Sequence, residues 1–241
     1  MAEEQKTGLF GLKIRPVQTQ EELDALLNPK HSLYGFNYKG MLFEPKNCIW
    51  KENKKLFYYD WHEERLKKSG LERAPTPQEI SSLVIDCLEG KLSPDLDDIG
   101  KDILNSYPEF TCHAMQTDGN YLHIYEFVTG LKWNRNSYDV PKSKWCQNKK
   151  SFDIKGLKIG KSNYLEDINI KNPDLVEYLY TRKFEQLPKE MKEGNKKARI
   201  YITENEGVWP ITHGEFWFDC FNIAASRGVR KKTGLANRAE K

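Results

Sequence analysis

The residues with the clearest chemical potential lie in one basic segment, residues 131–164. This segment carries nine basic and two acidic side chains, a net charge of +7, whereas residues 77–130 carry a net charge of −8. Four aromatic residues lie among the cations: Trp133, Tyr138, Trp145 and Tyr164. Cations that follow phosphates and rings that stack on bases are together typical of single-stranded nucleic-acid binding. The residues predicted to contact nucleic acid are Lys132, Arg135, Lys142, Lys144, Trp145, Lys149, Lys150, Lys158 and Lys161.

The type of cation predicts how such a surface would bind. The chain has 29 Lys and 9 Arg. Because the planar arginine fork suits base edges better than the lysine ammonium does, contacts should be made mainly to the backbone, with weak sequence selectivity. The alternative is that these lysines form an ordinary solvated face and protect a sheet edge, while the aromatic rings point into the core.

A second candidate site lies at residues 151–156, Ser-Phe-Asp-Ile-Lys-Gly. The acid-x-Lys pattern of Asp153 and Lys155 resembles the last motif of the PD-(D/E)xK nucleases, and the order of predicted elements around it is loosely similar to that family's core. The resemblance implies that Asp153 binds a divalent metal ion, that Lys155 orients the attacking water, and that Glu126 or Asp139 supplies a second carboxylate. Carboxylate oxygens suit Mg²⁺. The nuclease alternative therefore implies Mg²⁺ as a cofactor, and no cofactor is expected otherwise.

The histidines predict no metal centre. His113 and His123 lie on the two strands of a hairpin predicted around Asp118-Gly119, a strong turn signal. With these two residues as the loop, His113 would oppose Ile124, so the two histidines would be at best diagonal neighbours. We therefore expect them to be surface or half-buried side chains.

The cysteines predict structural thiols rather than a metal site or a disulfide framework. The five cysteines are Cys48, Cys87, Cys112, Cys146 and Cys220. Their spacing contains no CxxC pair, and an odd number of cysteines fits free thiols in a reducing cytosol. The first twenty residues lack the pattern of a signal peptide, and no apolar run approaches the roughly 20 residues that span a bilayer. These observations predict a cytoplasmic protein without a membrane partner.

The candidate site residues must be positioned by helices and strands. The clearest helix is predicted at residues 76–89. Thr76 is the expected N-cap, Pro77 the first helical residue and Glu79 the partner in a capping box, while Gly90 follows the end. Apolar residues recur on one face of this segment. Other helices are predicted at 19–28, 60–68 and 94–105. A last helix is predicted from Pro173 past residue 184, and Pro188 should end it or kink it.

Strands are expected between and after these helices. The strand-like runs are 9–17, 48–50, 56–60, 110–116, 121–128, 131–138, 150–159, 199–203 and 216–223. This order predicts an α+β fold, a mostly antiparallel sheet with about five flanking helices. Residues 1–226 are expected to form a single domain, followed by a flexible basic C-terminal tail at 227–241.

These patterns leave three classes of function open. The leading hypothesis is a nucleic-acid-associated binding protein that contacts backbone phosphates with low sequence selectivity. The alternative is a protein-interaction or accessory protein, such as an assembly or inhibitor factor, that uses exposed aromatic residues such as those at 216–221. The third is an enzyme, and its one concrete form is the metal-dependent nuclease. Common dinucleotide, nucleotide-triphosphate and α/β-hydrolase motifs are absent from the sequence.

Overall fold

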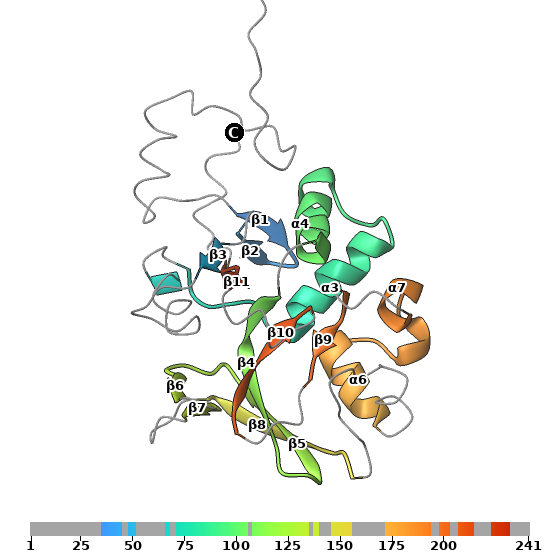
Figure 1. The fold of residues 1–241 in the computed structure, drawn as a ribbon. Coiled ribbons are helices and arrows are strands. Elements are labelled where there is room, and N and C mark those ends of the chain that lie inside the picture. Colours follow the sequence, from blue (N-terminus) through green and yellow to red (C-terminus); the bar gives the residue numbers. More distant parts are fainter. Residues whose placement is uncertain are drawn as a thin grey trace, which may run out of the picture.

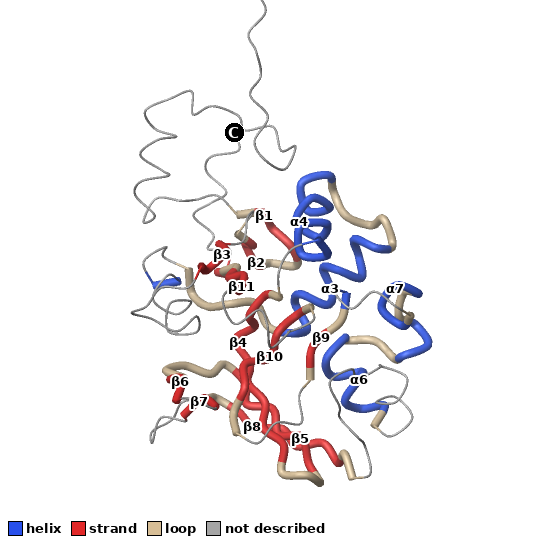
Figure 2. The backbone as a smooth tube through the Cα atoms, in the orientation of Figure 1, coloured by secondary structure: helices blue, strands red, loops and turns tan. Residues whose placement is uncertain are grey.

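A computed structural model describes residues 35–44, 48–51, 66–67, 71–105, 108–134, 137–139, 146–155, 172–193, 198–202, 207–214 and 223–231. In the strands at 48–51, 132–134, 137–139 and 223–226 it describes the backbone alone. Over these residues the predicted α+β class is confirmed: the helices lie along one side of a mostly antiparallel sheet (Figures 1 and 2). Within the described ranges, no helix combines the length and apolarity needed to cross a membrane.

The largest sheet is organised around β4 (Glu109–Thr117), of which eight of nine residues are buried. Antiparallel partners of β4 are β10 (Trp209–His213) and β5 (Tyr121–Glu126), and one parallel bridge joins it to β11 (Ile223–Ser226). Three further strands extend the sheet: β9 (Ile200–Tyr201) beside β10, β3 (Cys48–Lys51) beside β11, and β8 (Asn148–Asp153) beside β5. Strand β5 therefore lies between β4 and β8, towards the lower end of the molecule in Figure 1.

Two smaller sheets flank this one. Strands β1 (Phe36–Tyr38), β2 (Met41–Phe43) and β12 (Val229–Lys231) form one, and β6 (Lys132–Asn134) pairs with β7 (Ser137–Asp139) in the other. The predicted single run at 131–138 is therefore two short strands. Lys39 and Gly40 both have positive φ, 49° and 82°, as the type I′ turn between β1 and β2 requires.

The first residues of the predicted C-terminal tail belong to the fold. Val229 and its neighbours in β12 pair with β2, and the Arg227 side chain is fully buried. Arg227 is buried because carboxylates from elsewhere in the chain pair with it: Glu109 and Asp102. Residues 232–241 lie outside the described residues.

Helices α3 (Pro77–Leu88) and α4 (Pro94–Asn105) begin and end close to the predicted positions. The capping box of Thr76 and Glu79 is present in both directions. The two helices pack closely at Gly100, where an added Cβ would lie 2.5 Å from the Cβ of Cys87. The helix predicted from Pro173 also begins where expected. The Asn172 side chain caps α6 (Pro173–Tyr180) by accepting a hydrogen bond from the Leu175 amide.

The end of α6 differs from the prediction. Thr181 adopts a left-handed conformation with φ 57°, and its amide donates to the Glu177 carbonyl. The helix therefore ends at Tyr180, before Phe184, which was expected to belong to it. A 3-10 helix, η2 (Phe184–Gln186), and a short helix, α7 (Lys189–Lys192), follow. A left-handed cap is usually glycine, so threonine here gave no stop signal.

The remaining elements lie outside the described residues or differ from the prediction. The helix at 19–28 and the strands at 9–17 and 56–60 lie outside the described residues, as does most of the helix at 60–68. Strands β1, β2, β10 and β12 were not predicted. Trp209 and Pro210 belong to β10, where no strand was predicted.

The β4–β5 hairpin has a register shifted by two residues from the prediction. Met115 opposes Ile124, because the loop residues are Gly119 and Asn120 rather than Asp118 and Gly119. The Asp118 amide donates to the Tyr121 carbonyl, and Gly119 has φ 86° at the first central position, as a type II′ turn requires. The Asp-Gly pair therefore predicted where the turn lies, but the first loop residue is Gly119 rather than Asp118.

Replacing Leu83 by alanine should lower the free energy of unfolding by about 2–5 kcal/mol, because Leu83 of α3 is fully buried and its removal leaves a cavity. Urea unfolding of the variant and its parent measures this loss. Leu88→Ala is the matched control: the same change on the same helix at a half-buried position should cost clearly less. Equal unfolding midpoints for Leu83→Ala and the parent would contradict the packing described here.

Candidate nucleic-acid interface

Strands β5 and β8 present an open face at one end of the sheet. Side chains alternate along a strand, so alternate residues of β5 share this face with their partners on β8. The residues of the open face are Tyr121, His123 and Tyr125 on β5, opposite Asp153, Ser151 and Lys149 on β8. The other face is covered: Leu122 and Ile124 are buried, and the Phe152 ring packs 5.3 Å from that of Tyr178 on α6.

Aromatic rings run along the middle of the open face. The Tyr121 ring is 45% exposed and nearly parallel to the His123 ring, with an interplanar angle of 12° and centroids 6.2 Å apart. The Tyr125 hydroxyl donates to Oε1 of Gln116 at 2.8 Å, and the Lys149 Nζ lies 5.5 Å from the centroid of the Tyr125 ring. We refer to Tyr121, His123 and Tyr125 as the aromatic row.

Hydrogen bonds fix the central ring of this row on both sides. His123 Nδ1 lies 2.8 Å from the Ser151 Oγ, and Nε2 lies 3.2 Å from Oδ2 of Asp118. The other Asp118 oxygen accepts from the backbone amides of Tyr121 and Asn120. Both hydrogen bonds favour the ionised carboxylate and lower the pKa of Asp118, and the one from Tyr121 has the largest effect. The imidazole is therefore held in one orientation beside an anion.

Two of the nine residues predicted to contact nucleic acid have described side chains, and these two face opposite ways. Lys149 lies on the open face, whereas Lys150 lies on the covered one, with its Nζ 3.8 Å from Oε1 of Glu126 and 4.5 Å from the centroid of the Tyr178 ring. Lys132 is placed by its backbone in β6. The rest lie outside the described residues: Arg135, Lys142, Lys144, Trp145, Lys158 and Lys161.

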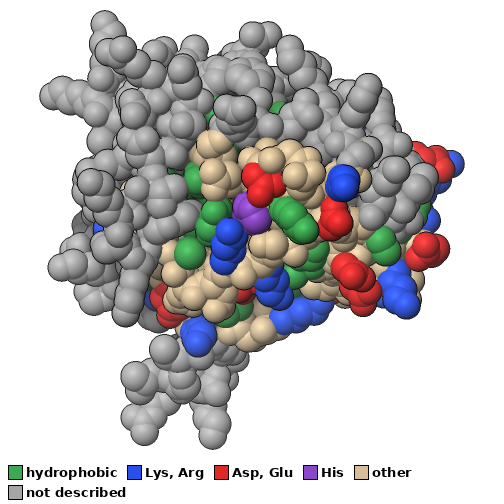
Figure 3. Space-filling model, turned by 90° about the horizontal axis from the view of Figure 1, so that it is seen from below, with side chains coloured by type: hydrophobic (Ala, Val, Ile, Leu, Met, Phe, Trp, Pro, Cys, Tyr) green, Lys and Arg blue, Asp and Glu red, His purple; other side chains and the backbone are tan. Residues whose placement is uncertain are grey.

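The described surface at this end carries mixed charge. Figure 3 views the molecule from below, and basic, acidic and apolar side chains are interspersed on its coloured part. On the open face, Lys149 is accompanied by Asp118 and Asp153. The predicted basic segment therefore does not appear here as a continuous basic patch, and the aromatic row is the more distinctive feature of the described residues.

The structure separates the predicted nuclease residues. Asp153 and Lys155 are both exposed, and Asp153 Oδ1 accepts from the Lys155 amide at 2.9 Å, which closes a local turn. Asp153 pairs with Tyr121 at one end of β5, and Glu126 lies at the other end, about 17 Å away along the strand. The Glu126 side chain also lies on the opposite face of the sheet from Asp153. Asp139 lies in β7, and its side chain is not described. No group of three or more His, Cys, Asp or Glu residues in the described chain could hold a metal ion.

Glu126 has a structural environment rather than one prepared for a metal. Tyr178 donates to its Oε1 at 2.6 Å, and Asn148 donates to Oε2 at 3.1 Å. Burial raises the pKa of the Glu126 carboxyl, but these two hydrogen bonds and nearby positive charge together outweigh burial and lower it. The hydrogen bonds join β5, β8 and α6 on the covered face.

The expectation of surface or half-buried histidines holds for His123 and is wrong for His113, which is 2% exposed. His213 is also buried, in β10. Cys87 and Cys112 are buried free thiols, and burial raises their pKa values to about 11 and about 12. At neutral pH these cysteines are protonated and unreactive, as expected for structural thiols.

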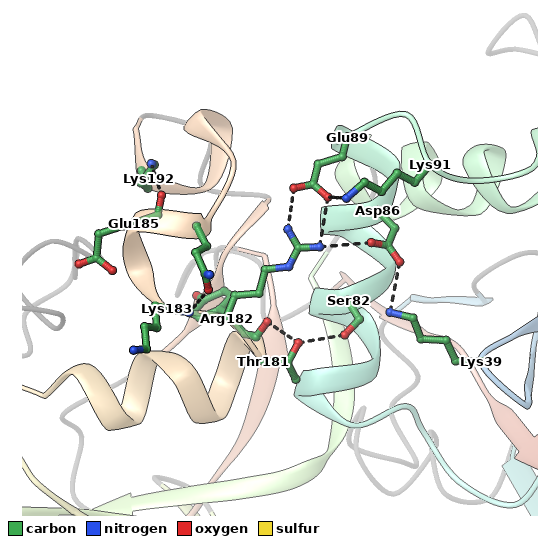
Figure 4. A network of polar contacts seen from close by, with 12 residues as sticks. Lys39, Ser82, Asp86, Glu89, Lys91, Thr181, Arg182, Lys183, Glu185 and Lys192 are labelled. Carbon is green, nitrogen blue, oxygen red and sulfur yellow. Dashed lines mark hydrogen bonds and ion pairs between the residues drawn. The ribbon is translucent and has the colours of Figure 1, made fainter.

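A second polar cluster lies between α3 and the segment after α6 (Figure 4). Arg182 donates to Glu89 at 2.6 Å and to Asp86 at 3.4 Å, and the Thr181 hydroxyl lies 3.2 Å from that of Ser82. Its charged groups pair with one another across the two elements. This cluster therefore fixes the end of α6 against α3.

Comparison with known proteins gives no relative from which a role could be transferred: no family model, curated protein or solved structure matches this chain.

Proposed function

We propose that the open face of β5 and β8 binds single-stranded nucleic acid, with the aromatic row stacking on bases and little sequence selectivity. The observation that carries this proposal is the placement of three rings at alternate positions of one strand, on the face that α6 leaves uncovered. Residues on the same face of a strand recur about every 7 Å, so successive rings can receive successive unstacked bases. Every base has a π-face, which makes such stacking tolerant of sequence.

The charge on the open face sets the expected balance of forces. Lys149 is its described cation, and two carboxylates lie nearby, so the described part of the site offers few phosphate contacts. Affinity at this face should come mainly from stacking. The predicted lysines outside the described residues would add phosphate contacts and a steeper dependence on salt.

The surface argues for nucleic acid over a protein partner. In the described ranges, the exposed large apolar side chain is that of Tyr121, and the residues around it are polar, such as Asp153. Protein interfaces usually present a contiguous apolar patch, whereas base stacking needs separated flat rings with polar surroundings. Free thiols at Cys87, Cys112 and Cys146 support a reducing, cytoplasmic location as part of the same proposal.

Fluorescence anisotropy with a single-stranded oligonucleotide tests the proposal. Tyr121→Ala should weaken binding by about 1–3 kcal/mol, or roughly 5- to 150-fold, because one stacking surface is lost. The slope of log affinity against log salt should change little, since stacking releases no counterions. Lys149→Ala should instead reduce this slope by about 0.7, the value for one phosphate contact on a single strand.

Lys150→Ala is the matched control for Lys149→Ala. The two lysines are adjacent in sequence but face opposite sides of β8, so the proposal assigns no nucleic-acid contact to Lys150. Equal effects of the two lysine substitutions would show that binding does not use the open face. Absence of binding by the parent at low salt would refute the nucleic-acid proposal as a whole.

A further inference from the structure

Three side chains on the open face form one continuous hydrogen-bonded chain, Ser151–His123–Asp118. Ser151 and His123 lie directly opposite each other on β8 and β5. The Ile154 amide donates to the Asn120 carbonyl, so alternation along the ladder makes the 123/151 pair a non-hydrogen-bonded one. Side chains come closest at such pairs, which explains the 2.8 Å contact between the hydroxyl and the imidazole.

The carboxylate determines which imidazole nitrogen carries the proton. Ionised Asp118 can only accept hydrogen bonds, so Nε2 of His123 must donate to it. In neutral imidazole the other nitrogen, Nδ1, then has a free lone pair that accepts from the Ser151 hydroxyl. A hydroxyl that donates to a base, which is itself oriented by a third group, is the arrangement that activates a serine nucleophile. Such triads are identified by geometry and roles rather than by sequence position.

We propose that Ser151 is an activated nucleophile that hydrolyses small carboxylic esters through a covalent acyl-serine, with His123 as general base and Asp118 as its positioning residue. This activity is independent of nucleic-acid binding, although the two would share one face. Ser151 is exposed, so an ester can reach its hydroxyl without any opening of the fold.

The reaction needs only the ester and water. The Ser151 Oγ attacks the carbonyl carbon, and His123 Nδ1 takes the hydroxyl proton. The bond from the acyl carbon to the alcohol oxygen then breaks, and the alcohol leaves with that proton. In the second half, water attacks the acyl-serine and gives a proton to His123, which returns it to Oγ as the carboxylic acid departs.

The surroundings of Ser151 indicate the class of ester. The exposed Tyr121 ring, parallel to His123, offers a stacking surface for a flat aromatic leaving group. Because Ser151 is in a non-hydrogen-bonded pair, its backbone amide points away from β5, where it can donate to the negative oxygen that develops during attack. An open sheet face suits small aryl esters better than long acyl chains, which would need a deep apolar pocket.

Covalent labelling of the full chain with a fluorophosphonate tests the proposal. The Oγ–phosphorus bond forms, the phosphorus–fluorine bond breaks, fluoride leaves and His123 takes the proton. Peptide mass spectrometry should locate the label on Ser151, and His123→Gln should slow labelling by about 100-fold or more. Asp118→Asn should also slow it by at least about tenfold, because an amide no longer imposes the required tautomer. Hydrolysis of p-nitrophenyl acetate should fall in the same order.

Two further variants keep the test decisive. Ser151→Cys places a thiol beside the imidazole, and iodoacetamide should alkylate it at least about tenfold faster than the thiol of Ser93→Cys, an exposed site ahead of α4. Labelling of Ser151 no faster than that of Ser93, or unchanged in His123→Gln, overturns the proposal. Because labelling is measured without oligonucleotide, its failure leaves the nucleic-acid proposal to be judged by anisotropy alone.

Discussion

Arg227→Met is expected to lower the free energy of unfolding by about 3–5 kcal/mol, the cost of leaving a buried carboxylate without its partner. Arg227 and Glu109 are 0% exposed, and the guanidinium donates to Glu109 at 3.0–3.3 Å. It also donates to the Glu44 carbonyl and to Asp102. Burial opposes the charged form of the guanidinium, but the two carboxylates outweigh burial and raise the pKa of Arg227. The pair joins β4 to the segment before β12.

Urea unfolding of three variants separates the cost of an unpaired charge from the loss of side-chain packing. The double variant Arg227→Met with Glu109→Leu should recover much of the lost stability, because removing both partners leaves no isolated charge. Asp102→Asn should cost about 1 kcal/mol or less, since the Asp102 side chain is 40% exposed and water can replace its contact. A stability of Arg227→Met within about 1 kcal/mol of the parent would be inconsistent with this buried pair.

The features that could be predicted from the sequence depend on residues close together in the chain. Thr76, Pro77 and Glu79 give the start of α3 within one helical turn, and Asn172 does the same for α6. The α+β class follows from the order of such segments. Local signals succeed here because capping bonds join residues three apart.

The features that were missed depend on distant partners. Arg227 is in sequence a member of a basic run, and its burial follows from Glu109, 118 residues away. Thr181 ends α6 in a conformation that favours glycine, with its hydroxyl beside that of Ser82 on α3. Neither contact can be predicted from the periodicity or the turn residues of the surrounding segment.

The candidate site shows the same division. The strand at 121–128 was predicted, but its aromatic face was not. Tyr121, His123 and Tyr125 alternate with aliphatic residues, a pattern that indicates a half-buried strand with one aromatic face. The sequence did not predict which of Lys149 and Lys150 lies on the open face, because this depends on how β8 pairs with β5. Counting lysines therefore predicted a basic surface, whereas strand register assigns one of these two lysines to the open face.

Acid should destabilise the protein between pH 7 and pH 5 by about 4 kcal/mol, through the two buried histidines. Burial lowers the pKa of His113 to about 4, despite nearby Glu126, and the pKa of His213 to about 3. In the unfolded chain each ring has a pKa near 6.5, so between these values the unfolded state binds more protons than the folded state. Stability is therefore lost as the pH falls below about 6.5, by up to about 1.4 kcal/mol per pH unit for each histidine, or about 2 kcal/mol for each at pH 5.

Urea unfolding at pH 7, 6 and 5 measures this dependence in a range where the carboxylates contribute little. Lowered carboxyl pKa values, such as those of Glu79 and Glu126, cost stability mainly below the ordinary carboxyl pKa of about 4.3. His213→Leu removes one of the two titrating rings, so the fall in stability between pH 7 and pH 5 should be halved whatever the variant's stability at pH 7. A parent protein equally stable at pH 7 and pH 5 would mean that these two rings are not buried as neutral imidazoles.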